Sequence, residues 1–420
     1  MTPPTPPLTR PDRRTFLRQA ALLAAGGGLL RGAAPGAEEL RQVLEAPVLD
    51  VSFVTRPVTV ASLELLRRGK DYLVRARSAD GVEAITVPNP AMMAKAWPVL
   101  LGSVFPPYLR QDARQLERLH WDAYRHASNY KMQGQLFWSA VMAVEQALLE
   151  LLARTAGRPV ADLFGGARRR EIPVYFASGN RGNTPEAEIE YLQGLVAGSG
   201  ARALKFRLGG RMSRDADSLP GRSERLIALA REKFGSGMTL YADANSSYRP
   251  AEAIRIGRVL EAHGYGFYEE PCEFDDLWGT REVADALTIP VAGGEQEFSL
   301  HRWHWMVAQR GVDIVQPDLH YGGGFIRATR VARMAAAAGM TVVPHMSGGG
   351  LGYLDVVHFA SWTPNIGPFQ EFKGNTALPV ACATSTLRCA GGVVQCPTGT
   401  GFGVTLDPAW VARAEVVRPA

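Results

Sequence analysis

The segment that decides the fold is Thr239-Leu-Tyr-Ala-Asp243, a short apolar run that ends in an acidic residue. Two later segments repeat this pattern, Gly266-Phe-Tyr-Glu269 and Pro290-Val-Ala-Gly-Gly-Glu295. The acids at 243, 269 and 295 are separated by 26 residues in each case. One strand, one helix and their connections take roughly that length in a (β/α)₈ barrel of about 250 residues. The spacing predicts that the three acids end neighbouring parallel strands and converge on one point.

The same alternation continues along the C-terminal half of the chain. Helical patterns such as Pro250–His263 and Phe325–Ala338 are each followed by a glycine and then by another apolar run. Eight such units predict an α/β protein with a TIM-type (β/α)₈ barrel over residues 170–385. The expected strands are Ile172–Ala177, Ala203–Leu208, Met238–Ala244, Gly266–Glu270, Ile289–Gly293, Val312–Gln316, Met340–Pro344 and Ile366–Phe369. A doubly wound sheet is the alternative, but the first strand lacks the glycine-rich phosphate turn typical of that fold.

A different pattern precedes the barrel. Strand-like runs at Val48–Val54 and Tyr72–Ala76 are followed by helical stretches at Ala113–Ala127 and Phe137–Ala156. This order predicts an α+β capping domain over residues 46–165. The last segment, residues 386–420, is expected to pack back on that domain.

The N-terminal residues 1–36 have the pattern of an export signal. Asp12-Arg-Arg-Thr-Phe-Leu-Arg18 resembles the twin-arginine motif, and the apolar run Ala20–Leu30 follows it. Eleven residues, three of them glycine, are too short to span a bilayer, so no stable membrane anchor is expected. Small residues at 32–37 offer a cleavage site. We expect export of a folded protein to the periplasm by the twin-arginine machinery; a disordered basic tail is the alternative.

Charge and cysteine content exclude two classes of protein. The formal net charge is +5, but residues 1–34 hold five arginines and one aspartate, which leaves the rest close to neutral. No basic run with interleaved aromatics follows, so nucleic-acid binding is not expected. Cys272 stands alone, and Cys382, Cys389 and Cys396 lack a CxxC pair or a nearby histidine, which argues against zinc. One disulfide within the last group stays open.

Barrel enzymes carry their active sites at the carboxyl ends of the strands, and polar residues gather there in this sequence. Asp243, Glu269 and Glu295 would repel one another unless a cation neutralised them, and an all-oxygen set favours one Mg²⁺ ion. A lone acid at such a place would more often cap a helix or face solvent. The other candidates at strand ends are Lys205, Arg207, Asn245, Asp318, His345 and Glu371.

Alternation along the strands supports these assignments. In Ala203-Leu-Lys-Phe-Arg207, the two cations share one face and the two large apolar residues share the other. Because the outside of a barrel strand is covered by helices, Lys205 and Arg207 are expected inside, where a substrate carboxylate could pair with them. His345 lies one barrel unit after Asp318, which predicts an Asp–His pair with a more basic imidazole.

These segments resemble the enolase superfamily, specifically the branch of mandelate racemase and muconate lactonizing enzyme. The resemblance spans about residues 46–400 and includes Glu145. The matching motifs, in order, are Leu163-Phe-Gly-Gly166, Lys205-Phe-Arg207, Tyr241-Ala-Asp243-Ala-Asn245, Tyr268-Glu269-Glu270-Pro271, Ala292-Gly-Gly-Glu295, Gln316-Pro-Asp318 with Gly322–Gly324, and Val343-Pro-His345. Each motif is weak alone, but the ordered set is specific.

The resemblance implies a shared first step. Mg²⁺ binds a substrate carboxylate, a base removes the adjacent proton, and the metal stabilises the resulting enediolate. By position, Asp243, Glu269 and Glu295 would be metal ligands, and His345 with Asp318 would be the acid/base pair. Asn245 would contact substrate and Glu371 would hydrogen-bond to the enediolate. Loops around Val54–Ser62 and Leu208–Ser223 would select the substrate, and relatives are usually homo-oligomers.

One position departs from the family pattern. Racemases of this branch commonly have Lys-x-Lys on the second strand, with the second lysine as a base facing the histidine. Arg207 holds that position here, and a guanidinium stays protonated. Dehydration needs only one residue that acts first as base and then as acid. The substitution favours an acid-sugar dehydratase that gives a 2-keto-3-deoxy acid.

Two alternatives remain open on the sequence. Lys205 could serve either as a base or as a ligand of the substrate carboxylate; as a base it would allow a racemase or epimerase of a carboxylate. The second alternative is an exported protein that binds carboxylates without turnover, against which the complete acid/base set argues.

Overall fold

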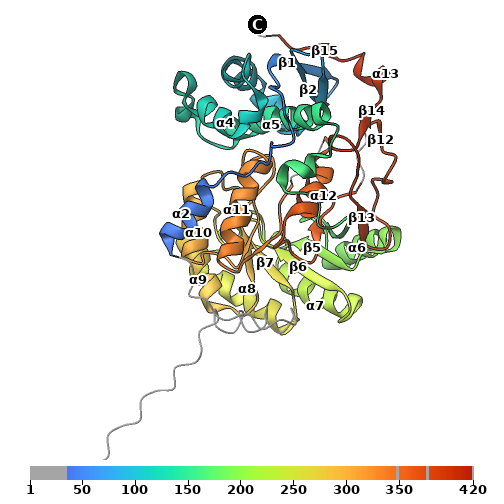
Figure 1. Ribbon diagram of the computed structural model, residues 1–420. Helices are drawn as coiled ribbons and strands as arrows, with labels where there is room; N and C mark the ends of the chain where they lie inside the picture. The colour runs from blue at the N-terminus through green and yellow to red at the C-terminus, as the bar shows by residue number, and fades with distance from the viewer. Residues whose placement is uncertain (1–35, 347–349, 375–377, 419–420) are drawn as a thin grey trace, which may run out of the picture.

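The computed structural model describes residues 36–346, 350–374 and 378–418. It consists of a mixed α+β domain and, below it in Figure 1, a barrel of strands and helices. The proposed export signal lies outside the described residues except for Gly36, so export stays a prediction.

Eight parallel strands form the barrel, as the sequence predicts. Their order around the sheet is β10-β9-β8-β7-β6-β5-β4-β11, so neighbours in space are neighbours in sequence except for β4 and β11, the first and last strands. The strands are β4 (Glu171–Ala177), β5 (Ala203–Arg207), β6 (Thr239–Asp243), β7 (Phe267–Glu269), β8 (Val291–Gly293), β9 (Ile314–Val315), β10 (Thr341–Val342) and β11 (Gln370–Glu371).

The last strand closes the barrel, but it lies later in the chain than predicted. The expected strand Ile366–Phe369 is wrong, because β11 starts at Gln370. Pro368 has no N–H to donate to a neighbouring strand, so the strand pairing is interrupted between Ile366 and Gln370. Ile366 bridges to β10 on one side, and β11 pairs with β4 on the other.

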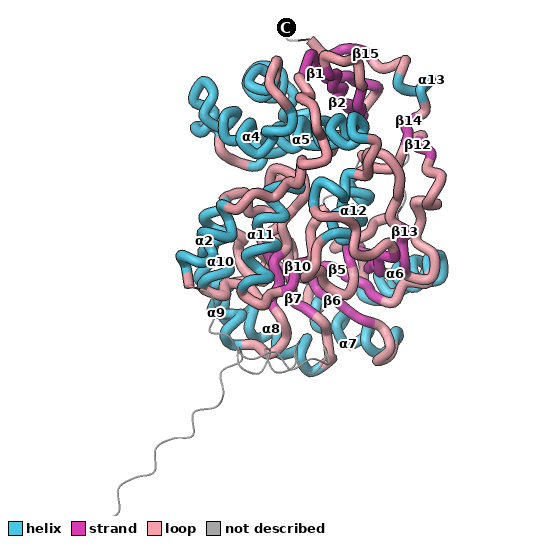
Figure 2. Tube along the Cα trace, in the orientation of Figure 1, coloured by secondary structure: helices cyan, strands magenta, loops and turns pink. Residues whose placement is uncertain are grey.

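Seven α-helices follow the strands within the described barrel and cover its outside (Figure 2). Local capping fixes several starts: Thr184 accepts a hydrogen bond from the N–H of Ala187, and Asp276 accepts one from Gly279. The helices are α6 (Pro185–Ser199), α7 (Arg222–Phe234), α8 (Pro250–Ala262), α9 (Leu277–Ala286), α10 (Leu300–Ala308), α11 (Phe325–Ala337) and α12 (Gly352–Trp362).

The capping domain contributes three strands to a four-stranded antiparallel sheet that packs against helices; the fourth strand comes from the C-terminal segment. Two strands, β1 and β3, were not expected from the sequence, while Tyr72–Ala76 lies within β2. Its elements are β1 (Val60–Arg68), β2 (Asp71–Ser78), β3 (Glu83–Thr86), α3 (Pro90–Val99), η1 (Leu100–Val104), η2 (Pro106–Tyr108), η3 (Ala113–Gln115), α4 (Leu116–Arg125), η4 (His126–Met132), α5 (Gln135–Ala156) and η5 (Val160–Phe164). The first helix, α2 (Ala37–Glu45), packs instead on α10 and α11 of the barrel.

Two local predictions in this domain need correction, one in kind and one in its bounds. The run Val48–Val54 is not a strand, because the N–H groups at its start donate to Glu117 and to the carbonyl of Leu163 in η5 rather than to a neighbouring strand. The N–H groups of Val48 and Leu49 both donate to Glu117 Oε1 at 2.9 Å. The helix expected at Ala113–Ala127 is confirmed over Leu116–Arg125 as α4, which follows the 3₁₀ turn η3. It ends earlier than expected, because the backbone turns into the left-handed region at Ala127 and the following serine.

The C-terminal residues join both parts of the molecule. Strand β13 (Val393–Gln395) pairs antiparallel with β4 of the barrel, and β15 (Glu415–Val416) pairs antiparallel with β1 of the capping domain. Between them lie β14 (Thr405–Leu406), which pairs with β12 (Val380–Ala381), and the short helix α13 (Pro408–Val411). All four cysteines are free thiols.

Helix α5 is long and apolar enough to span a membrane, but 94% of its most apolar window is buried inside the protein. That burial is typical of the central helix of a globular domain.

Glu145, a residue of α5, is fully buried and its carboxylate reaches the barrel. Glu145 Oε1 accepts hydrogen bonds from the N–H of Phe325 at 2.5 Å and of Ile326 at 3.3 Å, the first turn of α11. Glu145 therefore caps a barrel helix from the capping domain.

This contact also constrains the glycines before α11. A Cβ at Gly324 would come within 2.2 Å of Glu145 Oε1, and the φ of Gly324 is +100°. Burial raises the pKa of Glu145 to about 8, although the two backbone N–H groups act in the opposite direction. The carboxyl group is thus more easily protonated in the folded state than in the unfolded state.

Replacing Glu145 should therefore destabilise the protein in a pH-dependent way. Glu145→Ala leaves two buried N–H groups without a partner and should cost about 1–3 kcal/mol. Because the folded pKa is raised, wild-type stability should fall as the pH rises from 4.5 to about 8 through this residue, and Glu145→Gln should lack that part of the decline. Urea unfolding at pH 5 and pH 8.5 measures both effects, and Glu190→Gln, at an exposed position of α6, is the control. If Glu145→Ala proves as stable as the wild-type protein, the capping role of Glu145 is contradicted.

Candidate active site

The three acids predicted to bind metal lie together at one end of the barrel. Asp243 and Glu269 are paired in register as the last residues of β6 and β7. Glu295 follows β8 after a turn at Gly294, whose φ is +108° and whose missing Cβ leaves room for the ring of Trp303. Carboxylate oxygens of all three lie within 4.8 Å of one another, and all three residues are buried.

This donor set fits a divalent cation. Three carboxylate oxygens without nitrogen or sulfur donors suit a hard ion such as Mg²⁺. One acid also receives a neutral donor, since Gln316 Nε2 donates to Glu269 Oε2 at 2.7 Å. Such outer contacts orient metal-binding carboxylates.

Two cations from β5 contact the same acids. Lys205 Nζ lies 2.5 Å from Glu269 Oε1 and 3.8 Å from Asp243 Oδ2, and Arg207 Nη1 also contacts Asp243 Oδ2. Both cations are buried inside the barrel, where the strand alternation places them. Burial lowers the pKa of Lys205, but the charge of Glu269 and the neighbouring Tyr175 outweigh burial and raise it above its usual value. Lys205 is therefore held as an ammonium ion in this arrangement.

The predicted Asp–His pair is present, with Asp318 just after β9 and His345 just after β10. His345 Nδ1 lies 2.7 Å from Asp318 Oδ2, and the two residues form a parallel bridge that continues the barrel. Asp318 Oδ1 accepts backbone hydrogen bonds from His320 at 2.7 Å and Tyr321 at 2.6 Å, which fixes the carboxylate. The Nε2 atom of the imidazole is thereby aimed toward the metal acids, 3.2 Å from Glu295 Oε2.

Charge around His345 makes it more basic. Burial lowers its pKa, but the carboxylates of Glu295 and Glu371 and the hydrogen bond to Asp318 outweigh burial and raise the pKa to about 9. Neutralisation of Glu295 by a bound cation would weaken this support and return the imidazole toward its ordinary pKa. The group can then exchange a proton near neutral pH.

Glu371 ends β11 and is fully buried between cations. Its Oε1 lies 3.3 Å from Lys373 Nζ, and its Oε2 lies 3.8 Å from His345 Nε2. Burial raises its pKa, but Lys373, Lys205 and His345 outweigh burial and lower the pKa below its usual range. An ionised carboxylate only accepts hydrogen bonds. In this arrangement Glu371 suits a substrate hydroxyl better than an enediolate oxygen.

Asn245 lies at the rim of the site. Its Nδ2 donates to Asp243 Oδ2 at 3.1 Å and to Glu270 Oε2 at 3.3 Å, and its Oδ1 accepts from Arg181 Nη2 at 2.6 Å. Its φ of +39° is one of several left-handed values that turn the chain after the strands. The loop after β5, named among the substrate-selecting candidates, lies beside it, because Met212 N donates to Asn245 O at 3.0 Å.

Several residues of the site were not anticipated from the sequence. Glu270 is buried, and burial followed by the charges of Glu295 and Glu269 raises its pKa to about 8. Strand alternation predicts that Glu270 faces outside the barrel, but its left-handed φ of +41° breaks the alternation. Gln316 ends an expected strand and could have been found by that position. Arg181 and Lys373 come from loops, whose course no periodicity predicts.

Comparison with known proteins agrees with this geometry. The family described as enolase C-terminal domain-like matches residues 188–410, more than half of the chain. The chain belongs to the enolase superfamily. Its structural neighbours include a mandelate racemase/muconate lactonizing protein from Paracoccus denitrificans complexed with magnesium. The two chains are 25% identical, and they superpose with a TM-score of 0.76 over 86% of this chain and 99% of the other. A solved structure from Roseobacter denitrificans is 32% identical, with a TM-score of 0.79 over 86% of this chain and 99% of its own.

Curated relatives of this superfamily member differ in their reactions. An arabinonate dehydratase from Saccharolobus solfataricus is 28% identical over 63% of this chain and 69% of its own length. A D-galactarolactone cycloisomerase from Agrobacterium fabrum is 29% identical over 71% and 79%, and an L-Ala-D/L-Glu epimerase from Bacillus subtilis is 28% identical over 68% and 75%. Membership therefore supports the general chemistry of the superfamily, and leaves elimination and isomerisation both possible.

Metal binding should depend on the acid cluster. Mg²⁺ added at 100 times its dissociation constant should stabilise EDTA-treated protein by about 2–3 kcal/mol, because an ion that binds only the folded state adds its binding free energy to stability. Glu269→Gln should lose most of this stabilisation, while Glu273→Gln, a partly exposed neighbour with its own ion pair to Arg214, should keep it. Thermal unfolding with and without Mg²⁺ measures the difference. Equal stabilisation of both variants would place the ion elsewhere.

Proposed function

We propose that this protein is a Mg²⁺-dependent hydro-lyase that dehydrates a sugar acid to a 2-keto-3-deoxy acid. The protein would remove the proton next to the substrate carboxylate and then eliminate water from the adjacent carbon. Its dehydratase relatives support this reaction class, and the residues at the mouth of the barrel favour it over isomerisation.

The observation that carries the proposal is Arg207. Racemisation needs a proton acceptor on each face of the reacting carbon, and a guanidinium cannot accept a proton at neutral pH. Arg207 is bound to Asp243 and Lys205 to Glu269, so both side chains of β5 act as cations in this geometry. That leaves His345 as the acid/base group of the set.

His345 can perform both proton transfers. Asp318 holds Nδ1 as the protonated nitrogen, which leaves the Nε2 lone pair free to take the α-proton. The imidazolium formed is stabilised by Asp318 and can return the proton to the departing hydroxyl group. One residue thus serves as base and then as acid.

The other residues hold the substrate. A bound Mg²⁺ would draw electron density from the substrate carboxylate and so make the adjacent proton more acidic. Lys205 is positioned to pair with the same carboxylate. Asn245 and Glu371 can hydrogen-bond to substrate hydroxyl groups, which would fix the carbon that faces His345.

Turnover should require His345 and should release water. We expect aldonic and aldaric acids with Mg²⁺ to give 2-keto acids, and His345→Asn to lower kcat by about 10²–10⁴-fold, the usual contribution of a general acid/base, with ligand affinity retained. Semicarbazone absorbance measures the product. A panel in which no sugar acid yields a 2-keto acid would refute the dehydratase assignment, and unchanged ligand binding in a protein without any turnover would favour a binding protein.

A racemase or epimerase is the second candidate, because the amine of Lys205 also lies in the site, against Glu269 and Asp243. Reaction in D₂O separates the two. An isomerase would place deuterium at the α-carbon of recovered substrate without forming 2-keto acid, whereas a dehydratase consumes that substrate.

The charge of the rim favours a substrate with a second anionic group. Arg181 and Arg211 make no ion pair with a carboxylate among the described residues. Burial, followed by the nearby charges of Arg207 and Arg211, lowers the pKa of Arg181 to about 10. An anion placed beside these guanidinium groups would relieve their repulsion. A sugar diacid supplies one carboxylate to the metal and a second to Arg181.

Arg181→Gln should therefore affect diacids selectively. We expect kcat/KM for an aldaric acid to fall by about 10–100-fold, the loss of one charge-assisted hydrogen bond, and that for the matching aldonic acid to change less than threefold. Arg225→Gln is the matched control, because Arg225 is an exposed residue of α7 that pairs with Glu186. Equal losses on both acids would show that Arg181 only supports Asn245.

A further inference from the structure

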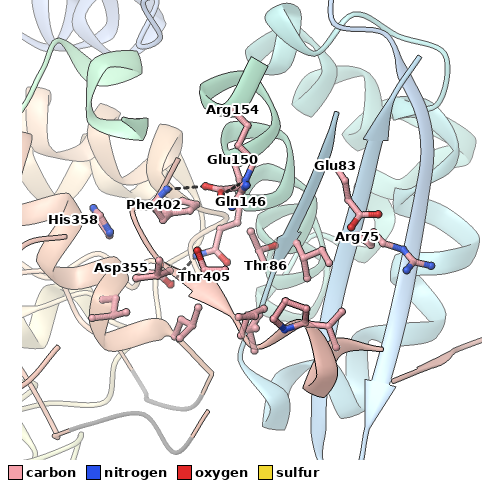
Figure 3. A pocket seen from close by; sticks show the side chains of 18 of the residues that line it. Arg75, Glu83, Thr86, Gln146, Glu150, Arg154, Asp355, His358, Phe402 and Thr405 are labelled. Carbon is pink, nitrogen blue, oxygen red and sulfur yellow. Dashed lines mark hydrogen bonds and ion pairs between the residues drawn. The ribbon is translucent and has the colours of Figure 1, made fainter. Parts of the chain in front are cut away.

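A chain of buried polar residues runs from the capping domain to the acid/base pair. Asp355 on α12 accepts a hydrogen bond from Gln146 Nε2 on α5 at 2.7 Å, and both residues line the cavity between these helices (Figure 3). The same oxygen, Asp355 Oδ2, lies 2.8 Å from His320 Nε2. The exposed fraction of each of the three residues is at most 4%. The capping domain is thereby connected to the loop that follows β9.

His320 continues this chain to Asp318 through its backbone. The N–H of His320 donates to Asp318 Oδ1 at 2.7 Å, and the N–H of Tyr321 donates to the same oxygen at 2.6 Å. The other oxygen, Asp318 Oδ2, lies 2.7 Å from His345 Nδ1. One oxygen of Asp318 therefore bonds to the loop and the other to the imidazole. A movement of the loop that rotates this carboxylate also changes the orientation of His345.

The ring of His320 depends on Asp355 for its hydrogen bonding. His320 Nδ1 is buried and has no partner among the described residues, so Nε2 makes the only hydrogen bond of the ring. Without Asp355 both ring nitrogens would be buried and unpaired, which is unfavourable. The ring would then move toward water, and the backbone N–H of His320 would move with it. The contact with Asp355 therefore fixes the N–H group that bonds to Asp318.

Two consecutive residues of α5 hold the two ends of the loop between β9 and α11. Glu145 accepts from the N–H of Phe325 at the start of α11. Gln146 reaches His320 at the other end of the loop through Asp355. A loop held at both ends suits a carboxylate that must keep an imidazole in one orientation, because a small displacement of a catalytic group lowers the rate strongly.

We propose that Asp355 is a positioning residue for proton transfer, which acts on His345 through His320 and Asp318. Asp355 fixes the loop by accepting hydrogen bonds, and its charge is not required. Its effect on turnover rests on the proposed function, whereas its effect on the loop does not.

Hydrogen–deuterium exchange followed by mass spectrometry tests the effect on the loop without any substrate. Asp355→Ala should speed exchange of the N–H groups of His320 and Tyr321 by about tenfold or more, because their hydrogen bonds to Asp318 would open more often. Asp355→Asn should exchange like the wild-type protein, since its amide oxygen can accept from both Gln146 and His320.

Glu150→Ala is the matched control. Glu150 is a buried carboxylate of α5 that lines the same cavity, and it accepts from Arg154 at 2.6 Å and from the N–H of Phe402 at 2.7 Å. Its loss should destabilise the protein without changing kcat or the exchange of the loop after β9. Equal effects of Glu150→Ala and Asp355→Ala would show a general loosening between α5 and its neighbours, and would overturn the positioning role.

Kinetics with the sugar acid found active test the effect on proton transfer. Asp355→Ala should lower kcat by about 10–100-fold, the cost of a misplaced catalytic group, and should change KM by less than about threefold. Asp355→Asn should keep kcat within about threefold of the wild-type value, because the hydrogen bonds are retained. In the His345→Asn protein, the added change Asp355→Ala should alter kcat by less than about twofold, because Asp355 acts only through that imidazole.

Three results would overturn the proposal. They are wild-type exchange of the loop in Asp355→Ala, a loss of kcat in Asp355→Asn as large as that in Asp355→Ala, and an equal loss on adding Asp355→Ala to the wild-type and His345→Asn proteins. If no sugar acid is turned over, the proposed function fails, and the exchange experiment still decides whether Asp355 holds the loop that bonds to Asp318.

Discussion

The repulsion among Asp243, Glu269 and Glu295 is the constraint on which the rest of the site depends. Parallel register on adjacent strands forces the first two side by side, and the turn at Gly294 brings the third to them. Two unit charges 4.8 Å apart repel by about 3–4 kcal/mol at an effective dielectric constant of 20. The fold can keep three such groups buried only if positive charge lies against them. Lys205 and Arg207 supply part of that charge. The three carboxylates suit a divalent cation, which would supply the rest.

The same balance of charge extends across the mouth of the barrel. His345 lies between Asp318, Glu295 and Glu371, and Lys373 lies on the far side of Glu371. Acids and bases thus alternate around the strand ends, and each shifts the proton affinity of its neighbour. Replacement of a lysine by Arg207 does not disturb this balance, because the charge is unchanged; it removes only the ability to accept a proton. The chemistry can therefore change while the electrostatic framework stays the same.

The capping domain and the C-terminal segment hold this framework from outside. Glu145 caps α11, the helix that follows the Asp318 loop, and Gln135 donates from the start of α5 to Gln296, whose side chain bonds Glu295. Strands β13 and β15 attach the C-terminal segment to barrel and cap in turn. A cavity of about 390 Å³ lies where the capping domain, α12 and the C-terminal segment meet (Figure 3).

The sequence alone determined the barrel, the acid cluster and the Asp–His pair, because strand alternation and a constant repeat length are local properties that survive in one dimension. It did not determine the eighth strand, where Pro368 divides the pairing, or the segment Val48–Val54, where Glu117 takes hydrogen bonds that a strand would have used. Arg181, Glu270 and Lys373 were also missed, because loops and left-handed residues follow no period. Only the tertiary structure decided which charges touch, since ion pairs such as Lys205–Glu269 join residues on different strands, and only closure of the barrel sets their distance.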